Sequence, residues 1–166
     1  SSAASDVYKR QPVAISHANP NFFHKSKRNI DTDILQKLVK KNGFIGLSLY
    51  PYHLKNLGDC TIEDFCEMIK ELVNLIGEDN IGIGSDLCLN WPDDVVMWMR
   101  NGKWTKNIDY GESKDKNPKW PKLPSWYKQP SDLNNLFFLM CENNIPEKVS
   151  TKIIGQNLFN FMKNQF

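Results

Sequence analysis

The sequence lacks an excess of charge of one sign and any long apolar run. Its 21 Lys and Arg against 19 Asp and Glu give a net charge of +2, which is no electrostatic footprint for nucleic acid or a membrane surface. No apolar stretch approaches the roughly 20 residues that a membrane-spanning helix needs. A nucleic-acid partner and a membrane span in this segment are therefore not expected. The composition, 40% hydrophobic and 24% charged over 166 residues, fits one globular unit.

Paired-cysteine motifs are also missing. None of the four cysteines stands in a Cys-x-x-Cys spacing, so neither a zinc knuckle nor a redox pair is indicated. We expect buried free thiols, with disulfide pairing in an oxidising compartment as the alternative. A nucleophilic role for Cys88 is disfavoured, because the sequence shows no histidine partner for it.

Residues 1–11, SSAASDVYKRQ, differ in character from the rest of the chain. They match, residue for residue, a transposase-type sequencing adapter translated in frame, so we expect a non-native tail here. The alternative is a small polar native tail. The native sequence would then be residues 12–166, beginning at the start of a strand, and we expect a fragment whose N-terminal part is missing. A signal region would lie in that part, so localisation stays open between cytoplasm and periplasm.

Short apolar runs and helical stripes alternate from Pro12 onward. Continuous apolar runs predict strands buried on both faces, and apolar residues at helical spacing predict amphipathic helices. Strand, helix and strand in close succession indicate βαβ units of a parallel sheet in an α/β protein. The predicted strands are Val13–Ile15, Phe44–Tyr50 and Asn80–Ser85, and the predicted helices start near Asp31, Thr61, Ser131 and Pro146.

Three chemically capable residues come after the predicted strands. His17 lies at the tip of the first strand, Arg28 is on the same loop, and Asp86 ends the third strand. In parallel α/β folds the strand ends and their loops converge at one edge, where the chemistry gathers. A histidine there suggests a metal ligand and an arginine suggests a carboxylate clamp. An acidic residue ending a buried strand is costly unless it is paired or metal-bound. Gly82 and Gly84 suggest close packing or a backbone approach to a site.

The segment Leu87–Gln129 is different in kind, because it holds all five tryptophans together with many Pro and Lys residues. We interpret it as an ordered, aromatic excursion around the mouth of a pocket, with a short helix near Val95–Met99. A subunit contact is a second possibility. Single-stranded nucleic-acid binding is disfavoured by the near-neutral net charge.

Four short pieces at or beyond the predicted strands and in the last helix form a recognisable pattern. They are SHAN (Ser16–Asn19), KRN (Lys27–Asn29), GIGSD (Gly82–Asp86) and GQN (Gly155–Asn157). Together they resemble the C-terminal half of the membrane (renal-type) dipeptidases, which are zinc dipeptidases of the metal-dependent amidohydrolase superfamily. The resemblance covers nearly all of residues 12–166.

The resemblance implies a TIM-like (β/α)8 barrel with a binuclear zinc site at its C-terminal mouth. This chain would supply about three βα units, a Trp-rich insertion and the closing helices. His17 and Asp86 would bind metal, Asp86 would also move the catalytic proton, and Arg28 would hold the substrate's terminal carboxylate. The two zinc ions would activate a hydroxide that attacks the peptide bond of a small dipeptide. A homodimer is one assembly open to the intact parent.

The sequence also departs from the family pattern. Leu87 and Cys88 come after Asp86 where many members have Asp and Gly, and Asn160 replaces an arginine near the last motif. The remaining metal ligands would lie upstream of Pro12, so the fragment itself is expected to be inactive, poorly folded and unable to complete a zinc site. The alternatives are a non-catalytic amidohydrolase-like binding protein and a hydrolase of other small amides.

Other polar residues near the predicted site are not expected to take part in its chemistry. We expect His24 and His53 to be surface loop residues, although His53 lies on a loop at the mouth side of the sheet. A substrate-binding tyrosine, which the resemblance implies, cannot be assigned between Tyr50 and Tyr52.

Overall fold

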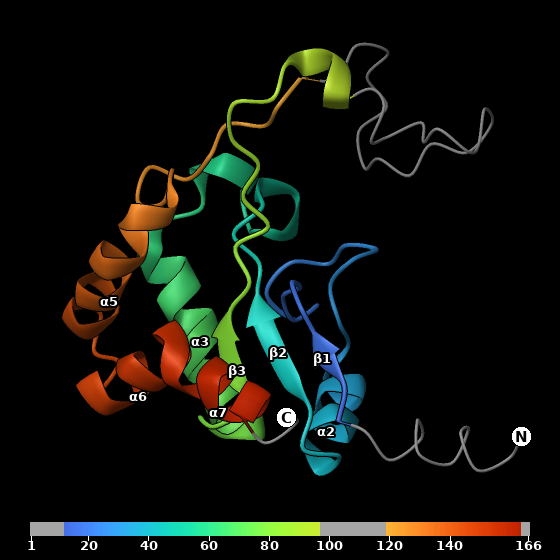
Figure 1. The fold of residues 1–166 in the computed structure, drawn as a ribbon, viewed down its shortest axis with the longest axis vertical. Coiled ribbons are helices and arrows are strands. Elements are labelled where there is room, and N and C mark those ends of the chain that lie inside the picture. Colours follow the sequence, from blue (N-terminus) through green and yellow to red (C-terminus); the bar gives the residue numbers. More distant parts are fainter. Residues whose placement is uncertain (1–11, 97–118, 164–166) are drawn as a thin grey trace, which may run out of the picture.

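The structure, a computed structural model, describes residues 12–96 and 119–163. Its centre is a parallel sheet in the order β1-β2-β3, with each strand beside the next one along the chain (Figure 1). The parallel α/β prediction is confirmed. The second strand is shorter than predicted, because it ends before Ser48, whose side chain and backbone bond to the neighbouring loops instead. The strands are β1 (Ala14–Ile15), β2 (Phe44–Leu47) and β3 (Ile81–Ile83).

Two helices make the crossovers between these strands, α2 (Thr32–Lys40) and α3 (Ile62–Ile76). Thr61 caps α3 by accepting a hydrogen bond from the Asp64 backbone N–H at 3.1 Å, which satisfies one of the free donors of the first turn. Asp31 stands at the N-cap of α2 without a capping bond, and instead accepts one from Asn21 Nδ2 at 2.7 Å. The predicted cap of α3 is thus confirmed, whereas the side chain of Asp31 ties α2 to the preceding loop.

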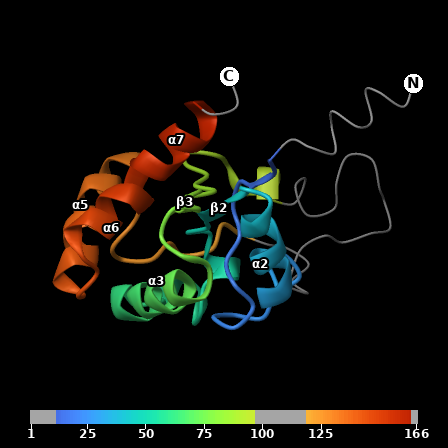
Figure 2. The same cartoon turned by 90° about the horizontal axis from the view of Figure 1, so that it is seen from below.

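The C-terminal helices cover β3. A short 3₁₀ turn, η3, leads into α5, and the predicted last helix is interrupted by a π-helical turn, η4. Asn157 holds this turn to the strand, because its Nδ2 donates to the carbonyls of Glu78 (2.6 Å) and Ile81 (2.8 Å). Seen from below, α5 and α6 lie to one side of the strands and α2 to the other (Figure 2). The elements are η3 (Pro130–Asp132), α5 (Leu133–Glu142), α6 (Glu147–Thr151), η4 (Lys152–Gln156) and α7 (Asn157–Lys163).

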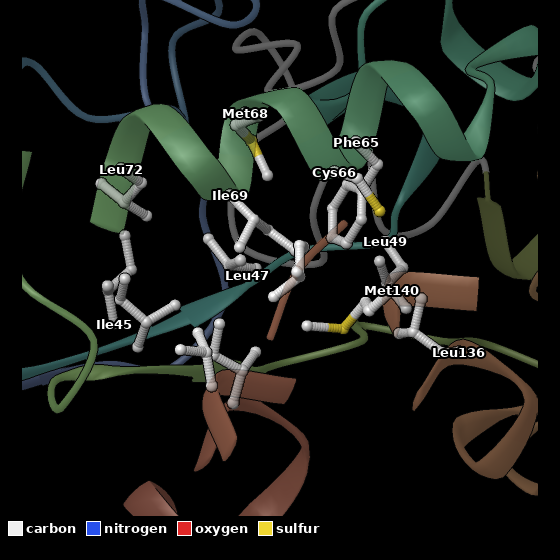
Figure 3. Close-up of a cluster of buried hydrophobic side chains, with 14 of the residues drawn as sticks. Ile45, Leu47, Leu49, Phe65, Cys66, Met68, Ile69, Leu72, Leu136 and Met140 are labelled. Atoms are coloured by element: carbon white, nitrogen blue, oxygen red, sulfur yellow. The ribbon is translucent and has the colours of Figure 1, made fainter. Parts of the chain in front are cut away.

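The hydrophobic core lies between the sheet, α3 and the C-terminal helices. The apolar face of α3 points toward β2 and α5 (Figure 3). The fully buried members include Ile45, Leu47, Phe65, Ile69, Leu72, Leu136, Met140 and Ile153. This packing fixes β2 and β3 as a rigid platform for the loops at their C-terminal ends.

Part of the Trp-rich segment packs against this platform. Trp126 donates from Nε1 to the Cys60 carbonyl at 2.8 Å, and its ring lies 5.1 Å from that of Phe65. Trp91 is 60% exposed. Trp98 and Trp104 lie outside the described residues, as does most of the predicted short helix, of which residues 93–96 are helical.

The four cysteines are free, and Cys60 and Cys66 are buried as predicted, whereas Cys88 and Cys141 are only half-buried. Across residues 12–96 and 119–163, no helix is long and apolar enough to cross a membrane.

Candidate functional site

His17 and Asp86 meet at the C-terminal edge of the sheet. His17 comes after β1 and Asp86 after β3, yet His17 Nε2 lies 4.0 Å from Asp86 Oδ2. The two side chains are 35% and 31% exposed, so both reach solvent. The structure therefore brings together the imidazole and the carboxylate that the sequence placed at one rim.

Two glycines explain how His17 reaches past β2. A Cβ at Gly46 or at Gly84 would overlap the carbonyl oxygen of Ser16, so the backbone after β1 lies across both neighbouring strands. The Ala18 N–H donates to the Gly46 carbonyl at 3.0 Å and anchors this crossing. The prediction of close packing or a backbone approach is confirmed at both glycines. The backbone of Ser16 approaches Gly84, whereas the ring of Phe44 packs against Gly82.

One of the two ring nitrogens of His17 is hydrogen-bonded within the protein. Its Nδ1 is hydrogen-bonded to Ser16 Oγ at 2.8 Å, while Nε2 faces Asp86. Metal-ligating histidines are commonly oriented in this way, with one ring nitrogen hydrogen-bonded and the other presented to the ion.

Asp86 adopts an unusual backbone conformation in a partly buried setting. Its φ of 51° lies in the left-handed region, which Asp tolerates better than most residues. Burial raises the pKa of its carboxyl, and the charges of His17 and Arg28 oppose that shift. Burial and the Asp86 carboxylate also raise the pKa of the Cys88 thiol. Cys88 is therefore protonated at neutral pH, in keeping with its predicted role as a packed thiol.

Arg28 lies on the loop between β1 and α2 and its side chain is exposed. The ends of this loop are joined by a parallel bridge between Pro20 and Ile30. The charge of Arg28 acts on both Asp86 and His53, which places the guanidinium beside the same edge of the sheet.

The prediction for His53 was wrong, because this side chain is only 3% exposed. It lies in the 3₁₀ turn η1 (Pro51–His53), and its Nδ1 is hydrogen-bonded to Ser48 Oγ at 2.8 Å. Burial lowers the pKa of His53 from 6.5 to about 4, helped by the charges of Arg28, His17 and His24. The ring is therefore neutral at pH 7. His24 is half-buried rather than fully on the surface.

Sequence reasoning also missed two buried asparagines that join the loops. Asn19 Nδ2 donates to the carbonyls of Ser48 (2.9 Å) and His53 (3.0 Å), and Asn19 Oδ1 accepts from the Ser48 N–H. Asn29 Nδ2 donates to the carbonyls of His24 (2.7 Å) and His53 (3.1 Å). Their positions, two residues after His17 and one after Arg28, were the available signal.

His17 and Asp86 are residue types that bind zinc, but two ligands are fewer than zinc usually takes. Zinc takes imidazole nitrogen and carboxylate oxygen, and usually four ligands in all. Within the described part of the chain, no three His, Cys, Asp or Glu residues are grouped closely enough to hold a metal ion. His17 and Asp86 are therefore two groups of the kinds that zinc binds, and the described residues bring no third such group close to them.

Solved structures resemble nearly the whole chain. An amidohydrolase from Pseudomonas aeruginosa superposes with a TM-score of 0.79 at 26% identity, covering 93% of this chain and 46% of that one. A metallopeptidase from Rhodobacter sphaeroides, solved with a phosphinate mimic of the dipeptide L-Ala-D-Ala, gives 0.68 at 17% identity, covering 94% and 37%. The fold is thus one found among amidohydrolases and metallopeptidases.

Sequence comparison identifies the family within that class. The membrane dipeptidase family (peptidase family M19) matches residues 5–93, more than half of the chain. The chain belongs to this family, as its motifs predicted. Dipeptidase aclJ of Aspergillus oryzae is 33% identical over 79 residues, which are 46% of this chain and 19% of that protein. The uncharacterized dipeptidase C965.12 of Schizosaccharomyces pombe is 29% identical over 85 residues, 50% and 20% of the two chains. The matched part thus spans about a fifth of these relatives.

Proposed function

We propose that this chain is the C-terminal part of a zinc-dependent dipeptidase whose full-length form is a TIM-like (β/α)8 barrel. The observation that carries the proposal is the 4.0 Å approach of His17 Nε2 to Asp86 Oδ2 in a member of the dipeptidase family. The parallel order β1-β2-β3, with helices in the crossovers, suits three consecutive units of such a barrel. The donors that complete a binuclear site would come from the rest of the full-length protein.

His17 and Asp86 have complementary tasks in this proposal. His17 binds the metal through Nε2, since Nδ1 is occupied by Ser16. Bound zinc would supply a hydroxide nucleophile and polarise the peptide carbonyl. Asp86 takes up the proton released during attack and passes it to the leaving amine. Its raised pKa suits this task, because a base whose pKa lies closer to the working pH both accepts and returns a proton readily.

Arg28 is the residue that holds the substrate. Its planar guanidinium is permanently charged and grips a carboxylate through two parallel hydrogen bonds. Its electrostatic effect on Asp86 supports a position close enough for a dipeptide to bridge the two, with the terminal carboxylate at Arg28 and the scissile bond near Asp86.

The experiment uses the full-length protein that contains this sequence, loaded with zinc. Products of a simple dipeptide are separated and counted for the wild type, His17→Ala and Asp86→Asn. Asn tolerates the left-handed backbone at position 86 but takes up no proton, so we expect folding to persist while kcat falls about 10²- to 10⁴-fold. His17→Ala should lose bound zinc as well as activity.

The matched control is Asp33→Asn, which removes an exposed carboxylate on α2 whose pKa is lowered by its hydrogen bond to Lys37. It should hydrolyse the dipeptide at the wild-type rate. Absence of hydrolysis by the zinc-loaded wild type, or full activity of Asp86→Asn, would show the proposal to be wrong.

A further inference from the structure

His53 is a buried imidazole whose second ring nitrogen has no partner among the described residues. Nδ1 is bonded to Ser48 Oγ, and no other group in residues 12–96 or 119–163 lies within hydrogen-bond distance of Nε2. Nε2 is also not among the polar side-chain atoms that are sealed from solvent without a partner in that part of the chain. A side chain that is 97% buried and still presents one polar atom outward is arranged to meet a ligand.

The Ser48 hydroxyl is the partner of His53 Nδ1. Ser48 Oγ accepts from the Tyr50 N–H at 3.2 Å, and Nδ1 of His53 is the acceptor for its own hydrogen among the described residues. We therefore assign Nδ1 as the acceptor in this pair. With that assignment, the neutral ring carries its hydrogen on Nε2, which makes that atom a donor.

The surroundings of His53 favour an anion. The charged or titratable groups that act on its ring are Arg28, His17 and His24, all of them basic. The carbonyl of His53 accepts from Asn19 and Asn29, which flank His17 and Arg28 in the sequence. The backbone of His53 is therefore tied at two points to the single loop that carries both the proposed metal ligand and the proposed carboxylate clamp.

We propose that His53 donates a hydrogen bond from Nε2 to the substrate's terminal carboxylate, beside Arg28. This inference rests on the proposed function and adds to it a neutral second donor in the substrate subsite. The neutral His53 ring adds no positive charge near His17, and its hydrogen bond to Ser48 fixes the direction in which Nε2 points. Tyr50, whose ring meets that of His53 edge-on at 5.4 Å, limits rotation of the imidazole.

Two substitutions of His53 separate the effect of the Nε2–H donor from that of the hydrogen bond to Ser48. In His53→Asn, the shorter amide can still bond to Ser48 but no longer reaches the position of Nε2. In His53→Gln, the longer amide places an N–H close to that position. Asp33→Asn is the control, because Asp33 is an exposed carboxylate on α2 that has no role in the proposal.

Steady-state kinetics on the zinc-loaded full-length protein give the first readout. We expect His53→Asn to raise KM for a dipeptide about 10-fold or more, the effect of one hydrogen bond to a charged group, with kcat within about twofold of wild type. His53→Gln should recover most of that loss, and Asp33→Asn should leave both constants unchanged. A fall in kcat at constant KM, or identical losses in the Asn and Gln variants, would overturn the inference.

Nitrogen NMR of the wild-type protein with labelled histidine gives a readout that needs no turnover. The inference requires a neutral His53 with hydrogen on Nε2, and an Nε2 resonance that moves when acetate is added as a carboxylate probe. Hydrogen on Nδ1, or an Nε2 resonance that acetate does not shift, would contradict it. If the wild type hydrolyses no dipeptide while the NMR result is as expected, the proposed function fails and the carboxylate site stands.

Discussion

At the residue scale, His53 shows how burial changes the role of a titratable side chain. Its turn begins at Pro51, and Pro-containing turns are usually solvated, so position in the sequence favours an exposed ring. The structure instead covers the ring and bonds it to Ser48. A histidine kept neutral in this way can donate a hydrogen bond without adding charge, but it makes the fold sensitive to acid.

This sensitivity is our first prediction. The pKa of His53 is about 4 in the folded protein, below its ordinary value of 6.5, so the unfolded chain takes up a proton first as the pH falls. Stability contributed by the neutral ring is complete above pH 6.5 and is lost between 6.5 and 4. Linkage gives a loss of about 2 kcal/mol between pH 7 and pH 5. Urea unfolding of the full-length protein at several pH values should show this loss.

The control for this measurement is His53→Gln, whose unfolding free energy should lack that part of the pH dependence. Every other titratable group is present in both proteins, so its contribution cancels in the comparison. Equal slopes for wild type and variant would contradict the lowered pKa.

At the element scale, the crossing of the Ser16 backbone over β2 and β3 decides where His17 points. Gly46 and Gly84 leave room for it, since either Cβ would collide with the Ser16 carbonyl. The sequence signalled an approach near Gly84 but gave no indication of which segment approached. That information depends on long-range packing, which periodicity in one segment does not encode.

We predict that Gly84→Ala is destabilising. The added methyl group meets backbone rather than a flexible side chain, so the crossing must shift, at a cost of about 1–3 kcal/mol. The same shift would move His17 away from Asp86 and lower the affinity for zinc. Chemical unfolding and zinc titration of the full-length protein measure the two effects.

Gly155→Ala is the natural comparison, because a Cβ at Gly155, in the π-turn η4, has no atom within 4 Å. It should be neutral or slightly stabilising and should bind zinc normally. If both substitutions cost the same, a general glycine effect rather than the crossing would be responsible.

The helices and the strand order were largely predictable because each depends on local signals. The capping residue Thr61 and the apolar stripe of α3 predict that helix, and short apolar runs predict the strands. The site was predictable to the extent that His17, Arg28 and Asp86 end or come after strands. Asn19, Asn29 and Ser48 were missed because buried polar residues are recognised by their partners, which lie up to 34 residues away along the chain.

At the scale of the whole molecule, the described sheet has three strands, and within those residues the outer edges of β1 and β3 carry no further strand. A barrel removes such edges by closing on itself, whereas an open parallel sheet leaves backbone donors and acceptors unpaired. In the same residues, no three His, Cys, Asp or Glu side chains are close enough together to hold a metal ion.

We therefore predict that the 166-residue chain alone unfolds without a cooperative transition and hydrolyses no dipeptide when zinc is added. Thermal unfolding monitored by near- and far-ultraviolet circular dichroism tests the first part, and product analysis tests the second. The full-length protein, handled identically, is the reference and should show both a sharp transition and hydrolysis. A sharp transition in the short chain would mean that its core suffices for folding.

The passage of Ser16 over Gly46 and Gly84 also constrains how this part of the fold can vary. Main chain occupies the space next to those two strands where side chains would otherwise project, so neither glycine has room for a larger residue. Sequence variation among descendants of this protein is therefore expected in the segments that connect the elements, such as those bearing Arg28 and His53, while the two glycines stay constant.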